Sequence, residues 1–173
     1  MSGERIWLFD TTLRDGGQTR GVDFSHADKI AIASALDDIG IDYVEGGWPG
    51  ANPTDDAFFA SPPKLKNAKM VAFGMTRRGG RSTANDPGLN AVLDAEVPAA
   101  CLVGKTWDFH VETALNITFE ENLDMISQSI AAAKERGREA MFDCEHFFDG
   151  YKANPSFALD CVKAAHAGGA SWV

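Results

Sequence analysis

Residues 6–18 read Ile-Trp-Leu-Phe-Asp-Thr-Thr-Leu-Arg-Asp-Gly-Gly-Gln, an apolar run that passes directly into a polar turn. Residues 6–9 are typical of a buried strand, because four large apolar side chains follow one another without polar alternation. Asp10, Arg14 and Asp15 then bring two carboxylates and a guanidinium to the end of that strand. This is where parallel α/β folds place their functional groups.

The rest of the chain alternates apolar strands with amphipathic helices. Ser25 is a good N-cap, and Ile32, Leu36 and Ile39 recur at spacings of four and three, which predicts the core face of a helix that ends at Gly40. The other predicted strands cover residues 42–45, 70–73, 100–103 and 140–142, the other helices 89–93, 118–137 and 154–168, and the polar loops 46–50 and 77–87.

Local signals mark the later helices and the end of the chain. Thr118 and Glu121 have the spacing of a capping box, and Asn154, which a proline follows, is a typical helix start. Residues 169–173 repeat the pattern of residues 40–44, namely glycine, a small or apolar residue, a polar residue, an aromatic and valine. We therefore expect the last residues to open a sixth strand.

Alternating strands and helices of this kind indicate an α/β protein with a parallel sheet. Two architectures are open: a doubly wound sheet and a (β/α)8 barrel. A barrel typically needs about 250 residues, and the 173 residues here supply about five βα units and the start of strand six. No Gly-x-Gly-x-x-Gly follows the first strand, which weakens the dinucleotide-binding version of the open sheet. Periodicity alone does not choose between the two.

The composition excludes several functional classes. The chain has 25 acidic and 16 basic residues, a net charge of −9, and 45% hydrophobic residues, which is ordinary for a globular protein. The negative charge argues against binding to nucleic acid or an anionic membrane surface. No apolar run approaches the roughly 20 residues of a membrane span, and the N-terminus has no signal-peptide pattern. The widely spaced Cys101, Cys144 and Cys161 indicate a reduced, cytoplasmic protein with cysteines in the core.

Polar clusters follow three of the predicted strands. The first, Asp10 to Asp15, can hold a divalent cation beside an anionic substrate, or it is a capped turn with a surface ion pair. The second begins at Glu45 and continues through residues 46–53. The third is Glu145 with His146. A carboxylate beside an imidazole can transfer protons in a reaction, and the alternative is an ordinary strand end without a function. In a barrel these loops converge.

Other polar residues are weaker candidates. Lys105, Asp108 and His110 follow the fourth strand, but a single loop histidine is more often a surface residue than a ligand. The basic residues of the 77–87 loop either bind phosphate or solvate the loop, and the second alternative is favoured; they are Arg77, Arg78 and Arg81.

Four strand-end stretches together resemble a known superfamily. Residues 10–16, Asp-Thr-Thr-Leu-Arg-Asp-Gly, resemble the signature of the DRE-TIM metallolyases, which include 2-isopropylmalate, homocitrate and citramalate synthases as well as lyases and aldolases. Residues 43–50, 104–111 and 143–152 look like the citramalate synthase branch. The resemblance extends from about residue 6 to the end and implies a (β/α)8 TIM barrel, of which this chain holds an incomplete part.

The resemblance implies roles for five residues. Arg14 matches the arginine that orients the substrate and stabilises an enolate, and Asp15 matches a carboxylate ligand of a divalent metal (Mg, Mn or Zn). Glu145 matches an acid–base residue that also binds the 2-oxo acid, while Glu45 and His110 match substrate-binding positions of the pocket. The implied reaction condenses acetyl-CoA with pyruvate to citramalate, or with 2-oxoisovalerate to 2-isopropylmalate, in isoleucine or leucine biosynthesis by a homodimeric acyltransferase.

The chain departs from that family in one important respect. The remaining metal ligands of the family include a His-x-His motif on a later strand, and no His-x-His occurs here. We therefore expect residues 1–173 to be the N-terminal portion of a pyruvate carboxyltransferase-like TIM-barrel catalytic domain, inactive in isolation. The alternatives are a metal-dependent lyase or aldolase of the same superfamily, and a non-catalytic half-barrel that associates with itself.

Overall fold

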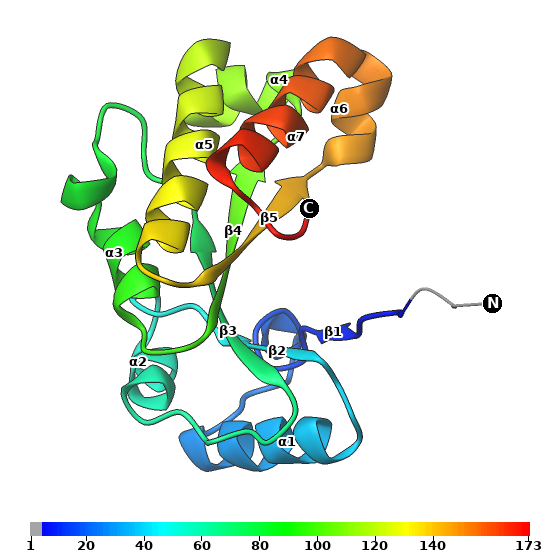
Figure 1. The fold of residues 1–173 in the computed structure, drawn as a ribbon, viewed down its shortest axis with the longest axis vertical. Helices are drawn as coiled ribbons and strands as arrows, with labels where there is room; N and C mark the ends of the chain where they lie inside the picture. The colour runs from blue at the N-terminus through cyan, green and yellow to red at the C-terminus, as the bar shows by residue number, and fades with distance from the viewer. Residues whose placement is uncertain (1–4) are drawn as a thin grey trace.

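A computed structural model describes residues 5–173; residues 1–4, part of the segment interpreted as lacking a signal peptide, lie outside them. The described part contains one sheet of five parallel strands, paired in chain order. They are β1 Phe9–Asp10, β2 Tyr43–Gly47, β3 Lys69–Met75, β4 Ala99–Lys105 and β5 Glu139–Glu145. Figure 1 shows this sheet curling as it passes from β1 to β5. Sequential pairing distinguishes a barrel from a doubly wound sheet, whose strand order reverses, so the fold is an incomplete TIM barrel as predicted.

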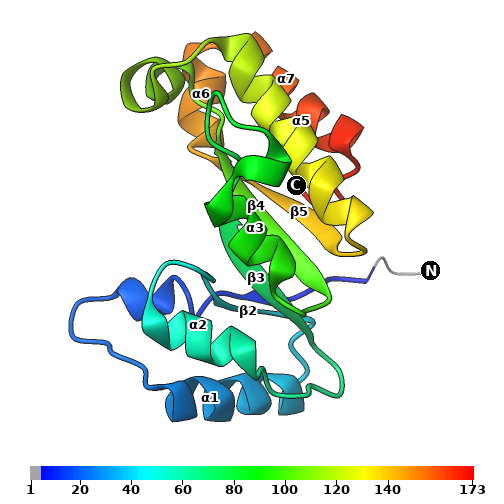
Figure 2. The same cartoon turned by 90° about the vertical axis from the view of Figure 1, so that its left-hand side faces the viewer.

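Helices follow the strands and cover the outer face of the sheet. Figures 1 and 2 show α1 and α2 beside the first strands, and α3, α5 and α7 beside the later ones. The helices are α1 His26–Asp38, α2 Pro53–Ala60, α3 Pro87–Asp94, α4 Asp108–His110, α5 Phe119–Glu135, α6 Phe147–Ala153 and α7 Pro155–Gly168, with short turns η1 Gly16–Gln18, η2 Thr83–Asn85 and η3 Val111–Leu115. No helix among residues 5–173 has the length and apolarity needed to cross a membrane.

The alternation of side chains along the strands creates two apolar clusters. Val44, Ala72 and Leu102 belong to the larger cluster, which lies between the sheet and the helices. Residues that alternate with such side chains along β2 to β5 point to the opposite face of the sheet and form the smaller cluster. That cluster comprises Tyr43, Val71, Phe73, Ala99, Cys101, Val103 and Met141. Charged side chains occur among these strands, with Glu45 inside β2, Lys105 at the end of β4 and Glu145 at the end of β5.

The predicted beginning of the fold needs two corrections. Residues 6–9 do not form a buried strand: β1 is only Phe9–Asp10, and Ile6 is 82% exposed, because β1 pairs with β2 alone among the described residues. Ile39 does not belong to the core face of α1, since it is the C-cap and is 74% exposed. The N-cap at Ser25 is confirmed, and Gly40 has the predicted left-handed conformation.

The later elements agree with the predictions in part. Thr118 accepts a hydrogen bond from the backbone of Glu121, but the Glu121 carboxylate pairs with Arg77 and does not complete the capping box. The predicted sixth strand is reduced to one parallel bridge between Trp172 and Met141. Helices α2, α4 and α6 were not predicted; for α2, the N-cap Asn52 followed by a proline at the first helical position is the local signal for a helix start.

Candidate active site

The Arg14 guanidinium is held from three sides at the carboxyl end of the sheet. The turn before it is tight, because the amide groups of residues 14–16 all donate to the carbonyl of Thr11. Arg14 Nε donates to Glu45 Oε2 at 2.6 Å, and Nη1 donates to Asp15 Oδ1 at 3.2 Å. Its guanidinium carbon also lies 3.9 Å from the ring centre of Phe73 on β3. The arginine is therefore a positive charge with a fixed position.

Glu45 is an unusually buried carboxylate. It is 1% exposed in the middle of β2, and burial raises its pKa to about 7. The Arg14 charge opposes that rise, whereas Asp143 and Asp15 add to it. A carboxyl group whose pKa is raised toward neutrality can exchange a proton as well as orient Arg14.

This raised pKa predicts a pH dependence of stability. Below pH 4.5, the ordinary pKa value, Glu45 is protonated in both the folded and the unfolded state. Between that value and about 7, the folded protein retains a proton that the unfolded chain has released, so the free energy of unfolding falls as pH rises. Equilibrium unfolding of the wild type and of Glu45→Gln at pH 5 and pH 7 checks this. We expect only the wild type to lose this contribution, and parallel pH profiles for the two proteins would contradict it.

A buried ion pair supports the loop that follows Glu45. The Lys29 ammonium contacts the Asp55 carboxylate and donates to the carbonyl of Gly46 at 2.9 Å. Asp55 also accepts from the backbone of Trp48 at 2.9 Å and from the amide of Asn52 at 3.0 Å. Because Lys29 and Asp55 are only 4% and 6% exposed, this buried network holds the loop of residues 46–52 in place.

The end of β5 contributes two further carboxylates. Met141, Asp143 and Glu145 share one face of the strand, since every second side chain points the same way. Partial desolvation raises the pKa of Asp143; nearby Glu145 and Asp15 raise it further, and Arg14 lowers it. Asp143 was not predicted as a site residue, although this alternation, extended from Glu145, was the available signal.

Glu145 is held by β4. The Lys105 ammonium contacts its carboxylate, and Thr106 Oγ1 donates to its backbone carbonyl at 2.7 Å. Helix α6 packs closely here because Gly150 has no side chain: a Cβ would lie 2.4 Å from the carbonyl oxygen of Thr106. The structure thus brings Lys105, initially a weak candidate, to the predicted acid–base residue.

His110 lies in a separate aromatic cluster. Its ring centre is 4.7 Å from both Trp107 and His146, and the two histidines meet edge to face. The His110 Nδ1 atom is buried without a hydrogen-bond partner among the described residues. These contacts place His110 near the end of β5, and the described interactions do not join it to Arg14.

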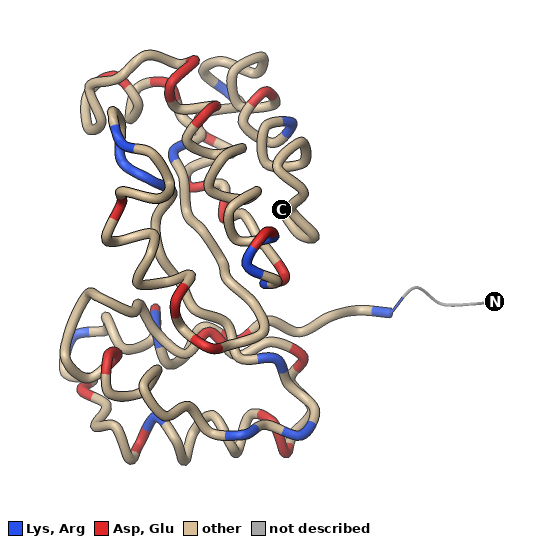
Figure 3. Tube along the Cα trace, turned by 60° about the vertical axis from the view of Figure 1, so that its left-hand side comes forward, with Lys and Arg blue, Asp and Glu red and all other residues tan. Residues whose placement is uncertain are grey.

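The first arginine of the basic loop after β3 has a structural role. Arg77 is 4% exposed; it donates to Glu121 at 2.7 Å and to Gln128 at 3.0 Å, which anchors the loop to α5. It therefore does not simply solvate the loop. Arg78 and Arg81 are exposed. Figure 3 shows acidic and basic residues distributed along the whole trace.

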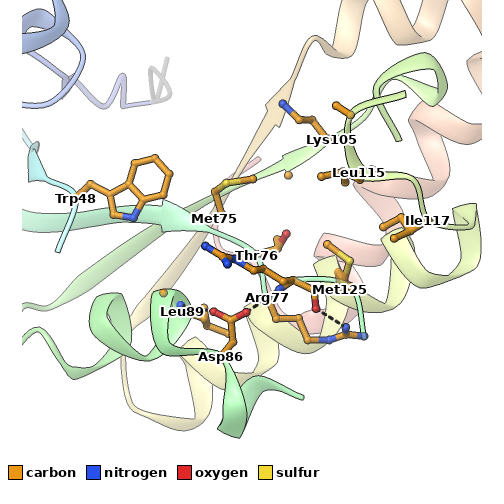
Figure 4. A pocket seen from close by; sticks show the side chains of 15 residues that line it. Trp48, Met75, Thr76, Arg77, Asp86, Leu89, Lys105, Leu115, Ile117 and Met125 are labelled. Carbon is orange, nitrogen blue, oxygen red and sulfur yellow. Dashed lines mark hydrogen bonds between the residues drawn. The ribbon is translucent and has the colours of Figure 1, made fainter. Parts of the chain in front are cut away.

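A cavity of about 390 Å³ lies beside the carboxyl ends of β3 and β4. Figure 4 shows it between α3, the ends of both strands and the segment before α5, with Lys105 among its lining residues. Most of its walls are apolar and include Met75, Leu89, Leu115, Ile117 and Met125. The site thus adjoins a space large enough for part of a small organic molecule.

The described residues do not by themselves form a metal centre. Residues 5–173 contain no group of three or more His, Cys, Asp or Glu side chains that could hold an ion. Asp15 is an accessible carboxylate, 61% exposed, whose ion-pair partner is Arg14. It could provide one ligand.

Five parallel strands paired in sequential order, with an arginine–carboxylate cluster toward their carboxyl ends, define an incomplete TIM barrel whose candidate site lies where such barrels carry their active sites. The chain belongs to the HMGL-like family, whose model matches residues 5–173. It is 52% identical over 172 residues to (R)-citramalate synthase of Aquifex aeolicus and 49% identical over 169 residues to that of Streptomyces coelicolor. A 2-isopropylmalate synthase of Sulfurisphaera tokodaii is 29% identical over 172 residues.

The coverage of these relatives is unequal. The Aquifex match includes 98% of this chain and 33% of the relative, the Streptomyces match 96% and 32%, and the Sulfurisphaera match 98% and 42%. The chain therefore spans about a third of the length of the citramalate synthases it matches. HMG-CoA lyase of Bacillus subtilis has the same fold, with a TM-score of 0.72, 18% identity, and coverage of 98% of this chain and 57% of that one.

Proposed function

We propose that this chain is the substrate-activating portion of an acyltransferase that condenses acetyl-CoA with a 2-oxo acid, and that the 2-oxo acid is pyruvate. The observation that supports this proposal most strongly is the fixed position of the Arg14 guanidinium. It contacts Glu45, Asp15 and Phe73 near the carboxyl ends of the strands. The choice of pyruvate rests on similarity: citramalate synthases are 44–52% identical to the chain, and 2-isopropylmalate synthases 29–31%.

The cluster suits a Claisen-type condensation. Glu145 takes a proton from the acetyl methyl group, and the resulting enolate attacks the keto carbon of pyruvate to form a carbon–carbon bond. Arg14 stabilises the negative charge that develops on oxygen, which then receives a proton. Water hydrolyses the thioester and releases CoA as a thiol. Glu45 keeps Arg14 oriented, and we assign His110 to the pocket wall beside the end of β5.

We also propose Asp15 as one ligand of a divalent cation, Mg, Mn or Zn. Such an ion polarises a carbonyl group when it is bound. Because the described residues do not complete a metal centre, we expect residues 1–173 alone to release no CoA.

The test is a CoA-release assay on the complete protein encoded by the gene, with pyruvate, 2-oxoisovalerate or no 2-oxo acid, and mass detection of the product. We expect citramalate to form, with pyruvate preferred over the bulkier acid by about tenfold or more, since additional methyl groups alter transition-state binding on that scale. Cleavage of a hydroxyacyl-CoA without any condensation would assign the protein to the lyases. A folded protein that self-associates but has neither activity would overturn the catalytic proposal.

A further inference from the structure

Lys105 links the predicted acid–base residue to the cavity. It is the last residue of β4 and is paired in register with Glu145, the last residue of β5. Its ammonium contacts the Glu145 carboxylate, and the two side chains are 17% and 34% exposed. Its backbone carbonyl accepts a hydrogen bond at 2.9 Å from Asn122, which is 1% exposed on α5. The lysine is therefore anchored at its backbone and engaged at its charge.

The distribution of charge gives this contact its importance. Four carboxylates lie close enough to influence one another's charge. They come from β2, from β5 and from the loop after β1, and they are Glu45, Asp143, Glu145 and Asp15. Arg14 is engaged by Glu45 and Asp15. Lys105 is the cation in contact with Glu145, which otherwise faces Asp143, two residues before it on the same side of β5.

We infer that Lys105 is a positioning residue, which holds the Glu145 carboxylate at the place where the proposed reaction needs a proton acceptor. This inference rests on the function proposed above. The lysine also contributes to the wall of the 390 Å³ cavity beside Met75 and Leu115 (Figure 4). Long cationic side chains line apolar surfaces with their methylene stems while the charged end binds elsewhere. A molecule in the cavity would therefore contact the residue that orients Glu145.

Two substitutions separate charge from shape. Lys105→Met preserves most of the stem and removes the charge, whereas Lys105→Arg keeps the charge; Lys152→Met, at an exposed position of α6, is the control. In the complete protein we expect Lys105→Met to lower kcat by about 10- to 100-fold, because a misplaced catalytic group costs on that order. We expect KM for pyruvate to change by less than about threefold, which marks a loss confined to the chemical step. Lys105→Arg should recover most of the rate, and the control should match the wild type.

A kcat for Lys105→Met within about twofold of the wild type, or an equal loss in Lys105→Arg, would overturn the inference, since positioning by charge predicts neither. Crystal structures of the wild type and Lys105→Met test it independently of activity. We expect the Glu145 carboxylate to leave its wild-type position in the variant. An unmoved carboxylate would overturn the inference even if the protein condenses pyruvate, and a displaced carboxylate would support it even if the proposed reaction fails.

Discussion

Replacement of Arg14 by Gln is expected to lower kcat of the complete protein by about 10²- to 10³-fold, the usual cost of removing a group that stabilises a developing oxyanion. The substitution removes the positive charge from the place where we propose that the keto group binds. It also leaves Glu45, 1% exposed, without its ion-pair partner. Arg14→Lys should recover little, because a lysine ammonium lacks the planar fork with which the guanidinium engages Glu45 and Asp15 while lying over the Phe73 ring.

Arg20→Gln is the matched control, since Arg20 is an exposed arginine in the same loop. Steady-state CoA release should be unaffected by this control. An Arg14→Gln protein that is folded and retains at least about a tenth of the wild-type kcat would show that the guanidinium does not act at the reacting oxygen.

The second large effect concerns stability. Lys29→Met is expected to lower the free energy of unfolding by about 3–5 kcal/mol, because it leaves the Asp55 carboxylate buried without its counter-charge. The hydrogen bonds from Trp48 and Asn52 to Asp55 remain, but they do not neutralise the charge. Denaturant-induced unfolding of the wild type and the variant under identical conditions measures the difference.

Lys163→Met is the control for this change. Lys163 also pairs with an aspartate, Asp160, but the two side chains are 73% and 42% exposed. Exposed pairs contribute about 0–1 kcal/mol, so the control should unfold close to the wild type. A loss below about 1 kcal/mol in Lys29→Met would mean that the pair is effectively solvated and does not anchor the loop after Glu45.

Local chemistry made much of the fold predictable. Ser25, Gly40 and Asn154 mark helix ends through hydrogen bonds and backbone conformations that involve only neighbouring residues. The exposure of Ile6 and the single bridge at Trp172 depend on which elements lie alongside, which a local pattern does not contain. For the same reason, the local pattern does not distinguish a barrel from an open sheet. The family resemblance predicts the barrel, and the sequential strand order shows it.

The site was predictable to a similar degree. Arg14 follows β1 as expected, whereas Glu45 lies inside β2, which continues to Gly47; the contact between them depends on β1 pairing with β2. The Lys105–Glu145 contact requires the β4–β5 register, and the Arg77–Glu121 pair requires α5 to pack against the loop after β3. Such long-range pairs have no local signature, whereas Asp143 could have been found from alternation along β5.

The most direct test of the account is a crystal structure of the complete protein with pyruvate and Mg²⁺. We predict that the pyruvate oxygens lie within hydrogen-bond distance of the Arg14 guanidinium, on the inner side of the barrel between Glu45 and Glu145. Pyruvate bound elsewhere, without contact to Arg14, would contradict the assignment of this cluster as the substrate site.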